Sequence, residues 1–237
     1  MTMNARSRIW ACLIPAMTFP FIGSLFYFAI LLGTPLGRIV YGATKGFTLV
    51  WPIVAILAIE RQPFALSRIG LSKHIRAIPA GLISGLVIAG VIIGFYRWGP
   101  LGEYVRQHQE AIRSNVEKFG LRSLGLYVAF GVFLAMFHSL LEEYFWRWYV
   151  FGRLSKVSGI SVAYGLAGLA FAAHHYVALS SYFPALLVAL FGTCVGIGGG
   201  FWCWLYRKQD SLAGCWVSHL LVDAALLYIG YDLLFAR

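Results

Sequence analysis

Long apolar runs constrain most strongly what this chain can fold into. A helix needs about 20 mostly apolar residues to cross a bilayer, and runs of that kind follow one another along the 237 residues. The predicted spans are residues 10–32, 47–59, 77–96, 124–151, 162–179, 184–206 and 212–235. Only 12% of the residues are charged, whereas a soluble domain carries about 25%. The sequence therefore predicts an all-α, polytopic membrane protein with about seven transmembrane helices.

The basic residues predict an orientation in the membrane. The formal net charge is +10, but lysines and arginines stand in small groups between apolar runs rather than in the stripe of a nucleic-acid-binding face. A cytoplasmic N-terminus puts the groups at residues 6–8, 61–76, 153–156 and 207–208 on the cytoplasmic side, as the positive-inside rule requires. We therefore expect a multi-pass protein of a bacterial-type inner (plasma) membrane, in contact with lipid and without a nucleic-acid partner.

The opposite side of the membrane receives the remaining basic residues. They are Arg38, Lys45 and those of segment 97–122. In that segment apolar side chains alternate with charged ones, which predicts an amphipathic helix on the membrane interface.

Glycines at four-residue spacing predict close helix packing. The spaced sets are Gly81 and Gly85, Gly90 and Gly94, and Gly192, Gly196 and Gly200. Small residues at this spacing let neighbouring helices approach closely in lipid. No strand precedes Gly196 to Gly200 and no Lys-Ser/Thr follows, so a phosphate-binding role is not indicated.

A few ionisable residues lie inside the predicted spans, where a charge costs about 2.5 kcal/mol or more. They are His138, Glu142, Glu143, Arg147, His174, His175, His219 and Asp223. Residues four apart share a helix face, which predicts that Glu143 pairs with Arg147 and that His219 faces Asp223. The helical rise places the groups at comparable depths from the cytoplasmic side. We therefore expect a polar catalytic cavity within the bundle.

One carboxylate and two imidazoles are sufficient to activate water against an amide bond. A buried glutamate can act as general base, one histidine can orient the water, and another can donate a hydrogen bond to the developing oxyanion. The same side chain types also suit a catalytic Zn²⁺, which takes His and Glu ligands and leaves a position open for water. The residue types leave both mechanisms open.

Three motifs in order carry a resemblance to a known family. Glu142-Glu143-x-x-x-Arg147, Phe171-x-x-x-His175 and His219-x-x-x-Asp223 resemble the motifs of the CAAX-protease and bacteriocin-processing family (CPBP, or Abi) of intramembrane proteases. The resemblance covers residues 124–235. It suggests N-terminal transmembrane helices with an interfacial amphipathic segment over residues 1–123 and a catalytic transmembrane core over 124–237. It implies a CAAX prenyl protease-like endopeptidase that cuts near the C-terminus of a membrane protein or lipidated peptide.

The resemblance also implies roles for single residues. Glu142 would activate the water with His175 beside it, and His219 would donate to the oxyanion, while three residues would have supporting places: Glu143, Arg147 and His174. Asp223 stands where many members have Asn. Because an ionised carboxylate accepts hydrogen bonds and cannot donate them, Asp223 is expected to orient His219.

The same resemblance leads us to expect catalysis without a metal and no required cofactor, because two histidines and one glutamate match the motif positions. The alternative is a zinc enzyme. The zinc ligands would then be Glu142, His175 and His219, with His138 as a further candidate.

Two other functions stay open. In a non-catalytic membrane scaffold or immunity-type protein, the same groups would form a structural polar network. In a small transporter, interior carboxylates would relay protons or bind cations. A transporter is expected to contain inverted repeats, and the sequence shows no internal repeat.

Overall fold

The computed structural model describes residues 4–63 and 70–236, and within these ranges the regular structure is helical. Residues 64–69, part of the predicted basic loop 61–76, lie outside the described residues, as do residues 1–3 and 237. Seven helical stretches are long and apolar enough to cross a membrane: Ala5–Ile30, Pro35–Glu60, Leu71–Trp98, Leu124–Val157, Ile160–Ser180, Ala185–Gln209 and Leu212–Leu234. This confirms the predicted all-α, multi-pass membrane protein.

The second span begins at Pro35 rather than at residue 47. Thr34 caps this helix, α2 (Pro35–Val54), by accepting a hydrogen bond from the Gly37 N–H at 3.0 Å. Proline at the first helical position supports the same start, because its fixed φ suits the helix and its missing N–H would have no partner there. Lys45 therefore lies inside the span and not in the loop where the sequence analysis put it.

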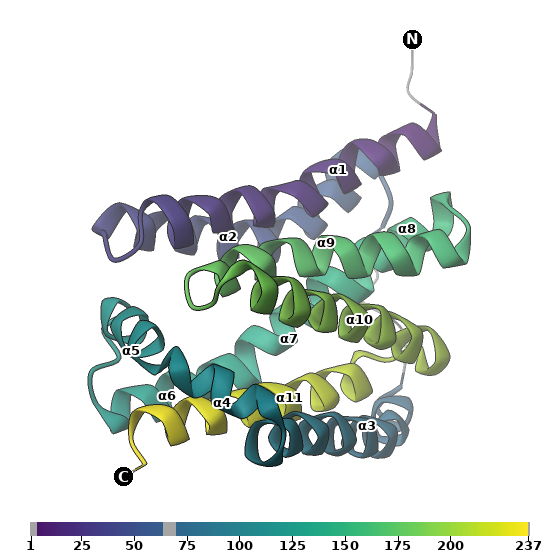
Figure 1. Ribbon diagram of the computed structural model, residues 1–237. Helices are drawn as coiled ribbons and strands as arrows, with labels where there is room; N and C mark the ends of the chain where they lie inside the picture. The colour runs from purple at the N-terminus through teal and green to yellow at the C-terminus, as the bar shows by residue number, and fades with distance from the viewer. Residues whose placement is uncertain (1–3, 64–69, 237) are drawn as a thin grey trace. The chain divides into compact units, whose positions relative to one another are not determined.

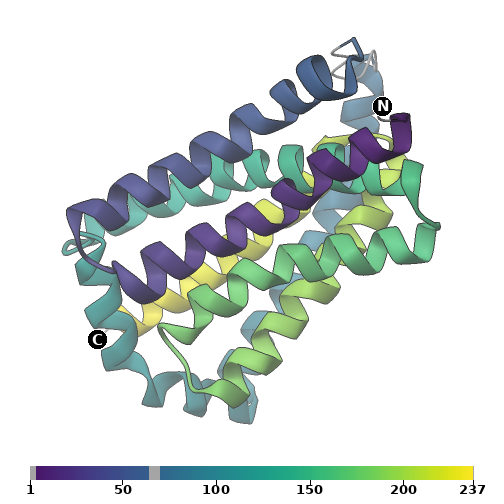
Figure 2. The ribbon, with the colours of Figure 1, turned by 90° about the horizontal axis from the view of Figure 1, so that it is seen from above.

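Contacts divide the chain into two compact units, and the first comprises Met1–Ile69 and Leu141–Asp210. Its elements are α1 (Ala5–Ser24), η1 (Leu25–Ile30), α2, η2 (Ala55–Glu60), η4 (Glu143–Phe151), α8 (Gly152–Val157), α9 (Ile160–Ser180) and α10 (Ala185–Gln209). Helix α9 packs along both α10 and α1 (Figures 1 and 2). Gly168 lets α9 approach α10 closely, since a Cβ there would lie 2.8 Å from the Gly196 carbonyl oxygen.

The second unit comprises Gly70–Leu140 and Ser211–Arg237. Its elements are α3 (Leu71–Trp98), α4 (Pro100–Gln107), α5 (Gln109–Lys118), α6 (Leu124–Phe133), η3 (Leu134–His138) and α11 (Leu212–Leu234). Helix α3 packs along α11 (Figure 1). A Cβ on Gly81 would overlap the Gly214 carbonyl oxygen, and one on Gly85 would lie 2.9 Å from the Ser218 Cα. Close packing through this glycine pair is therefore confirmed.

The segment predicted as one amphipathic helix forms two short helices, α4 and α5, which meet at His108. The backbone of His108 leaves the helical conformation, and its ring nitrogen Nδ1 bonds to the Tyr104 carbonyl at 2.7 Å. The apolar faces carry Val105, Ile112 and Val116. They pack on a cluster in the same unit formed by Tyr96, Tyr127, Leu233 and Leu234.

The fourth span, Leu124–Val157, changes its helical geometry along its length. It runs through α6, η3, α7 (Ser139–Glu142), η4 and α8, and both η3 and η4 are π-helical. A π turn holds more residues than an α turn, so it redirects the side chains that follow, and such turns are frequent at functional sites. Glu142 lies where α7 passes into η4.

The predicted domain boundary between residues 123 and 124 separates the part of the sequence without motifs from the part that contains them. This boundary stays a prediction.

Candidate active site

The Glu142 carboxylate is buried among three elements of the first unit. Its side chain is 6% exposed, and Oε1 lies 3.6 Å from Lys45 Nζ of α2 and 3.5 Å from His174 Nε2 of α9. A buried carboxylate needs cations or hydrogen-bond donors around it. The ammonium and the imidazole meet that need from two different helices.

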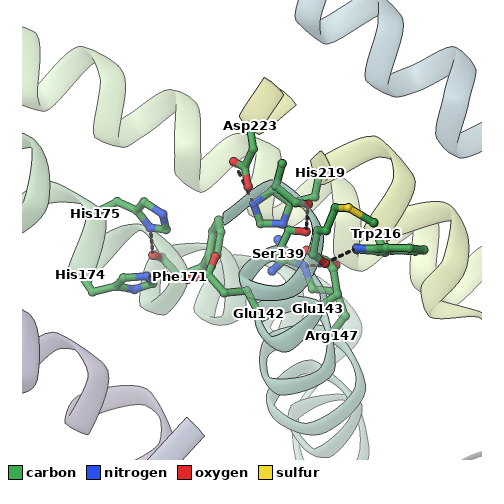
Figure 3. A network of polar contacts seen from close by, with 12 residues as sticks. Ser139, Glu142, Glu143, Arg147, Phe171, His174, His175, Trp216, His219 and Asp223 are labelled. Atoms are coloured by element: carbon green, nitrogen blue, oxygen red, sulfur yellow. Dashed lines mark hydrogen bonds and ion pairs between the residues drawn. The ribbon is translucent and has the colours of Figure 1, made fainter. Parts of the chain in front are cut away.

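Both adjacent histidines of α9 lie beside Glu142 (Figure 3). A ring nitrogen of His174, one of His175 and an oxygen of Glu142 all lie within 4.8 Å of one another. His175 Nδ1 lies 2.8 Å from the Phe171 carbonyl oxygen. Because a carbonyl only accepts, Nδ1 carries the proton, and in the neutral ring Nε2 is a hydrogen-bond acceptor.

His174 is held by an aromatic neighbour. Its ring stacks on Trp146, with centroids 5.5 Å apart and planes 5° from parallel. This stacking fixes the ring that faces the carboxylate. The choice of His175 as the working histidine and His174 as its support stays a prediction, since both lie next to Glu142.

A small pocket in the first unit adjoins this group. It is lined by Pro20, Tyr27, Thr44, Lys45, Thr48, Glu142, Phe145, Trp146 and His174. Its free space is about what one water molecule needs. A water bound there would lie among a carboxylate, an imidazole and an ammonium.

Glu143 and Arg147 form an ion pair with no exposed side-chain surface. Arg147 Nε lies 3.2 Å from Glu143 Oε2, so the pairing predicted from their spacing is present. The guanidinium carbon also lies 4.4 Å from the Phe171 ring centroid and 5.0 Å from that of Trp202. Arg147 thereby ties η4 to α9 and α10.

His219 and Asp223 belong to the second unit, one turn apart on α11. His219 Nε2 lies 3.6 Å from Asp223 Oδ1, and His219 is 4% exposed. Ser84 of α3 donates a hydrogen bond to the Ser218 hydroxyl at 3.1 Å, and the Trp216 indole donates to the Met136 carbonyl at 2.9 Å (Figure 3). These contacts fix α11 against α3 and η3.

The structure thus gathers the predicted residues into two groups, one in each unit. Glu142, His174 and His175 stand together in the first, while the second holds His219 with Asp223, and His138 at the end of η3. That both groups serve one reaction stays a prediction.

The donor set of the first unit fits a metal ion. Two histidines and one glutamate are ligands that catalytic zinc sites use, with a fourth position left for water. Ligand atoms on a tetrahedral zinc stand about 3.4 Å apart, close to the 3.5 Å between Glu142 Oε1 and His174 Nε2. The set Glu142, His174 and His175 differs from the predicted one in containing both residues of the histidine pair.

Two interior charges of the first unit were missed by the sequence analysis, of which Glu60 is buried and Lys45 is partly exposed. Lys45 contacts Glu142. Glu60, at the end of η2, has a side chain that is 1% exposed and pairs with Arg153 at 2.9 Å between Oε2 and Nε. A charged residue within an apolar span could have marked Lys45 as functional. The second span was predicted to begin at residue 47, however, so Lys45 was assigned to a loop.

The motif-bearing stretch is similar to a known protein family. Residues 124–225 match the model of a family described as type II CAAX prenyl endopeptidase Rce1-like. The match spans somewhat less than half of the chain and includes all three motifs, and it supports a CAAX-type intramembrane protease activity. No curated protein and no solved structure matches the chain significantly. Residues 124–225 of this multi-pass membrane protein are thus similar to the Rce1-like family, and the predicted resemblance to CAAX-processing proteases is confirmed over that stretch.

Proposed function

We propose that the protein hydrolyses a peptide bond near the C-terminus of a membrane-associated protein or lipidated peptide, with Glu142 as the base that activates water. The observation that carries the proposal is the buried Glu142 carboxylate, which lies beside His174 and His175 and, together with His174, lines a water-sized pocket. These residues lie within the stretch that matches the family model. A positioned general base contributes about 10²- to 10⁴-fold to the rate of such a reaction.

In the proposed step, a water proton passes to the Glu142 carboxylate while the water oxygen bonds to the scissile carbonyl carbon. The C–N bond then breaks and the proton held by Glu142 passes to the leaving amine, so the products are a carboxylic acid and an amine. The lone pair on His175 Nε2 accepts a hydrogen bond from the water. The Nε2 atom of His174 faces Glu142 Oε1 and holds the carboxylate in place.

His219 is the proposed donor to the oxyanion that forms on the substrate carbonyl. Asp223 Oδ1 lies 3.6 Å from His219 Nε2, where the carboxylate would orient the ring and stabilise the imidazolium, the form in which both ring nitrogens donate. Loss of a single oxyanion donor lowers kcat by about 10²- to 10³-fold in other proteases.

A zinc-dependent form of the same hydrolysis is the second candidate, favoured by the donor set Glu142, His174 and His175. Bound there, zinc would polarise the scissile carbonyl and make its water easier to deprotonate. The zinc-dependent mechanism predicts that zinc copurifies with the protein in proportion to its activity, and the metal-independent mechanism predicts that it does not.

We further propose that the protein lies in a bacterial-type inner membrane with its N-terminus in the cytoplasm. The basic groups Arg6 with Arg8, Arg153 with Lys156 and Arg207 with Lys208 would then share the cytoplasmic side.

The test is Glu142→Gln, assayed in proteoliposomes with an internally quenched farnesylated peptide that ends in a CaaX-type sequence. We expect kcat to fall by about 10²- to 10⁴-fold because the general base is lost, while the yield of folded protein is unchanged. Mass spectrometry of the products locates the bond that is cut. Glu103→Gln is the matched control, since Glu103 is 65% exposed on α4 and is expected to be dispensable. Full activity in Glu142→Gln would sink the proposed mechanism.

A further inference from the structure

Lys45 lies deep inside a membrane span. It follows Pro35, the first residue of the span Pro35–Glu60, by ten positions, which corresponds to about 15 Å along a helix. A cation at such depth is costly unless a partner faces it, and it marks a functional residue by default. Lys45 also lies outside the stretch 124–225 that matches the family model.

The partner of Lys45 is the proposed catalytic base. Its ammonium nitrogen lies 3.6 Å from Glu142 Oε1 and 5.6 Å from the Tyr41 ring centroid. Lys45 is 21% exposed at its side chain and lines the pocket with Thr44 and Thr48. The same Glu142 oxygen lies 3.5 Å from His174 Nε2, so an ammonium and an imidazole share one carboxylate oxygen.

This ammonium stands where it would repel a divalent metal. A zinc ion bound to Glu142 Oε1 at about 2.1 Å would lie at most about 6 Å from Lys45 Nζ. Two cations at that separation repel strongly within a protein, where the effective dielectric constant is lower than in water. The donor set Glu142, His174 and His175 therefore has the ligands for zinc, but its negative charge is already balanced by Lys45.

We propose that Lys45 is the counter-cation of Glu142 and that it keeps divalent metal out of the Glu142, His174 and His175 donor set. Lys45 is thus a positioning residue, which acts on the reaction by holding the carboxylate. This inference rests on the proposed role of Glu142 as the base that works without a metal.

The test measures binding of zinc alone to the full-length, metal-stripped protein in detergent, by equilibrium dialysis. We expect Lys45→Met to bind one zinc at least about tenfold more tightly than wild type, because the repulsion is removed. Lys45→Arg is expected to behave as wild type, since its guanidinium keeps the charge. The gain of Lys45→Met is expected to disappear when Glu142→Gln is added.

Arg38→Met is the matched control, because it removes an exposed cation from the same helix two turns earlier. It is expected to leave zinc binding unchanged. Equal zinc affinity of wild type and Lys45→Met, or a gain in Lys45→Arg, overturns the inference. Tight stoichiometric zinc in wild type that is lost in Glu142→Gln overturns it as well, without requiring any Lys45 variant to fold.

Peptide hydrolysis by the same proteins separates this inference from the proposed function. Lys45→Met is expected to lower kcat about tenfold or more with little change in KM, and Lys45→Arg to restore most of it. An active Glu142→Gln contradicts the proposed function whatever the zinc results. An inactive Glu142→Gln, together with unaltered zinc binding and kcat in Lys45→Met, contradicts only the role of Lys45.

Discussion

Arg147 and Glu143 have no exposed side-chain surface and hold each other on η4 at 3.2 Å. Removing two charges from water is expensive, so such a pair adds little net stability, yet the loss of one partner leaves an uncompensated charge in the interior. Phe171 and Trp202 pack against the guanidinium. Because neither side chain of the pair is exposed, a charge left alone at either residue would not reach water. The pair therefore supports the fold around Glu142 rather than the chemistry itself.

Arg147→Met is expected to destabilise the protein by about 3–5 kcal/mol, because Glu143 then stays buried without its cation. The measurement is thermal unfolding in detergent, together with the yield of monodisperse protein. Glu142→Gln is expected to lower activity with the yield unchanged, which separates the two adjacent acids. A non-catalytic scaffold would instead show both variants acting through yield alone.

Residue spacing allowed the prediction of contacts within a helix but not of contacts between helices. The pairs Glu143 with Arg147 and His219 with Asp223 are each four residues apart on one helix, where the geometry is set by the helix itself. Lys45 and Glu142 come from different spans. Their contact depends on tertiary packing, which the spacing of one sequence does not encode.

At the scale of elements, the fourth span illustrates the same limit. Its apolar run predicted one helix, whereas the chain alternates between α and π geometry through η3 and η4. In a helix that is apolar on all faces, the sequence has no alternation of apolar and polar residues, so a change from α to π geometry leaves no trace in the sequence pattern. The orientation of Glu142 therefore could not be derived from the regular rotation of an α-helix.

Two glycines of α3 allow a matched test of how closely α3 packs on α11, because Gly85 contacts α11 and Gly90 does not. Gly85→Ala places a Cβ 2.9 Å from the Ser218 Cα, where backbone must move, whereas nothing lies within 4 Å of a Cβ on Gly90. We expect Gly85→Ala to lower stability by about 1–3 kcal/mol through overpacking, and Gly90→Ala to be neutral or slightly stabilising. Thermal unfolding of both variants in the same detergent checks this. Equal midpoints would show that α3 and α11 do not pack through Gly85.

At the scale of the whole molecule, composition alone was sufficient for the fold class. The scarcity of charge and the recurrence of apolar runs fixed an all-helical membrane protein, because a bilayer leaves the backbone few other ways to satisfy its polar groups. The count of seven spans is confirmed. The start of the second span was wrong because Arg38 and Lys45 interrupt its apolar character, and a buried partner for Lys45 could not be seen in advance.

Seven spans lead to a topology that reporter fusions can check. With the N-terminus in the cytoplasm, residues 158–159 are expected on the cytoplasmic side and residues 181–184 on the opposite side. Alkaline phosphatase, which is active only outside the cytoplasm, is expected to be inactive when fused after Ser158 and active when fused after Phe183. The reverse pattern would invert the proposed orientation.

The residues that line the pocket beside Glu142 come from two different parts of the chain. Its lining residues Pro20, Tyr27, Thr44, Lys45 and Thr48 come from the N-terminal helices, and the remainder come from the stretch that matches the family. Substitutions in α1, η1 and α2 can thus alter the size and charge of the pocket while every motif residue stays the same. The pocket is thus encoded in two separate parts of the gene, so its shape can change during evolution through the N-terminal part alone.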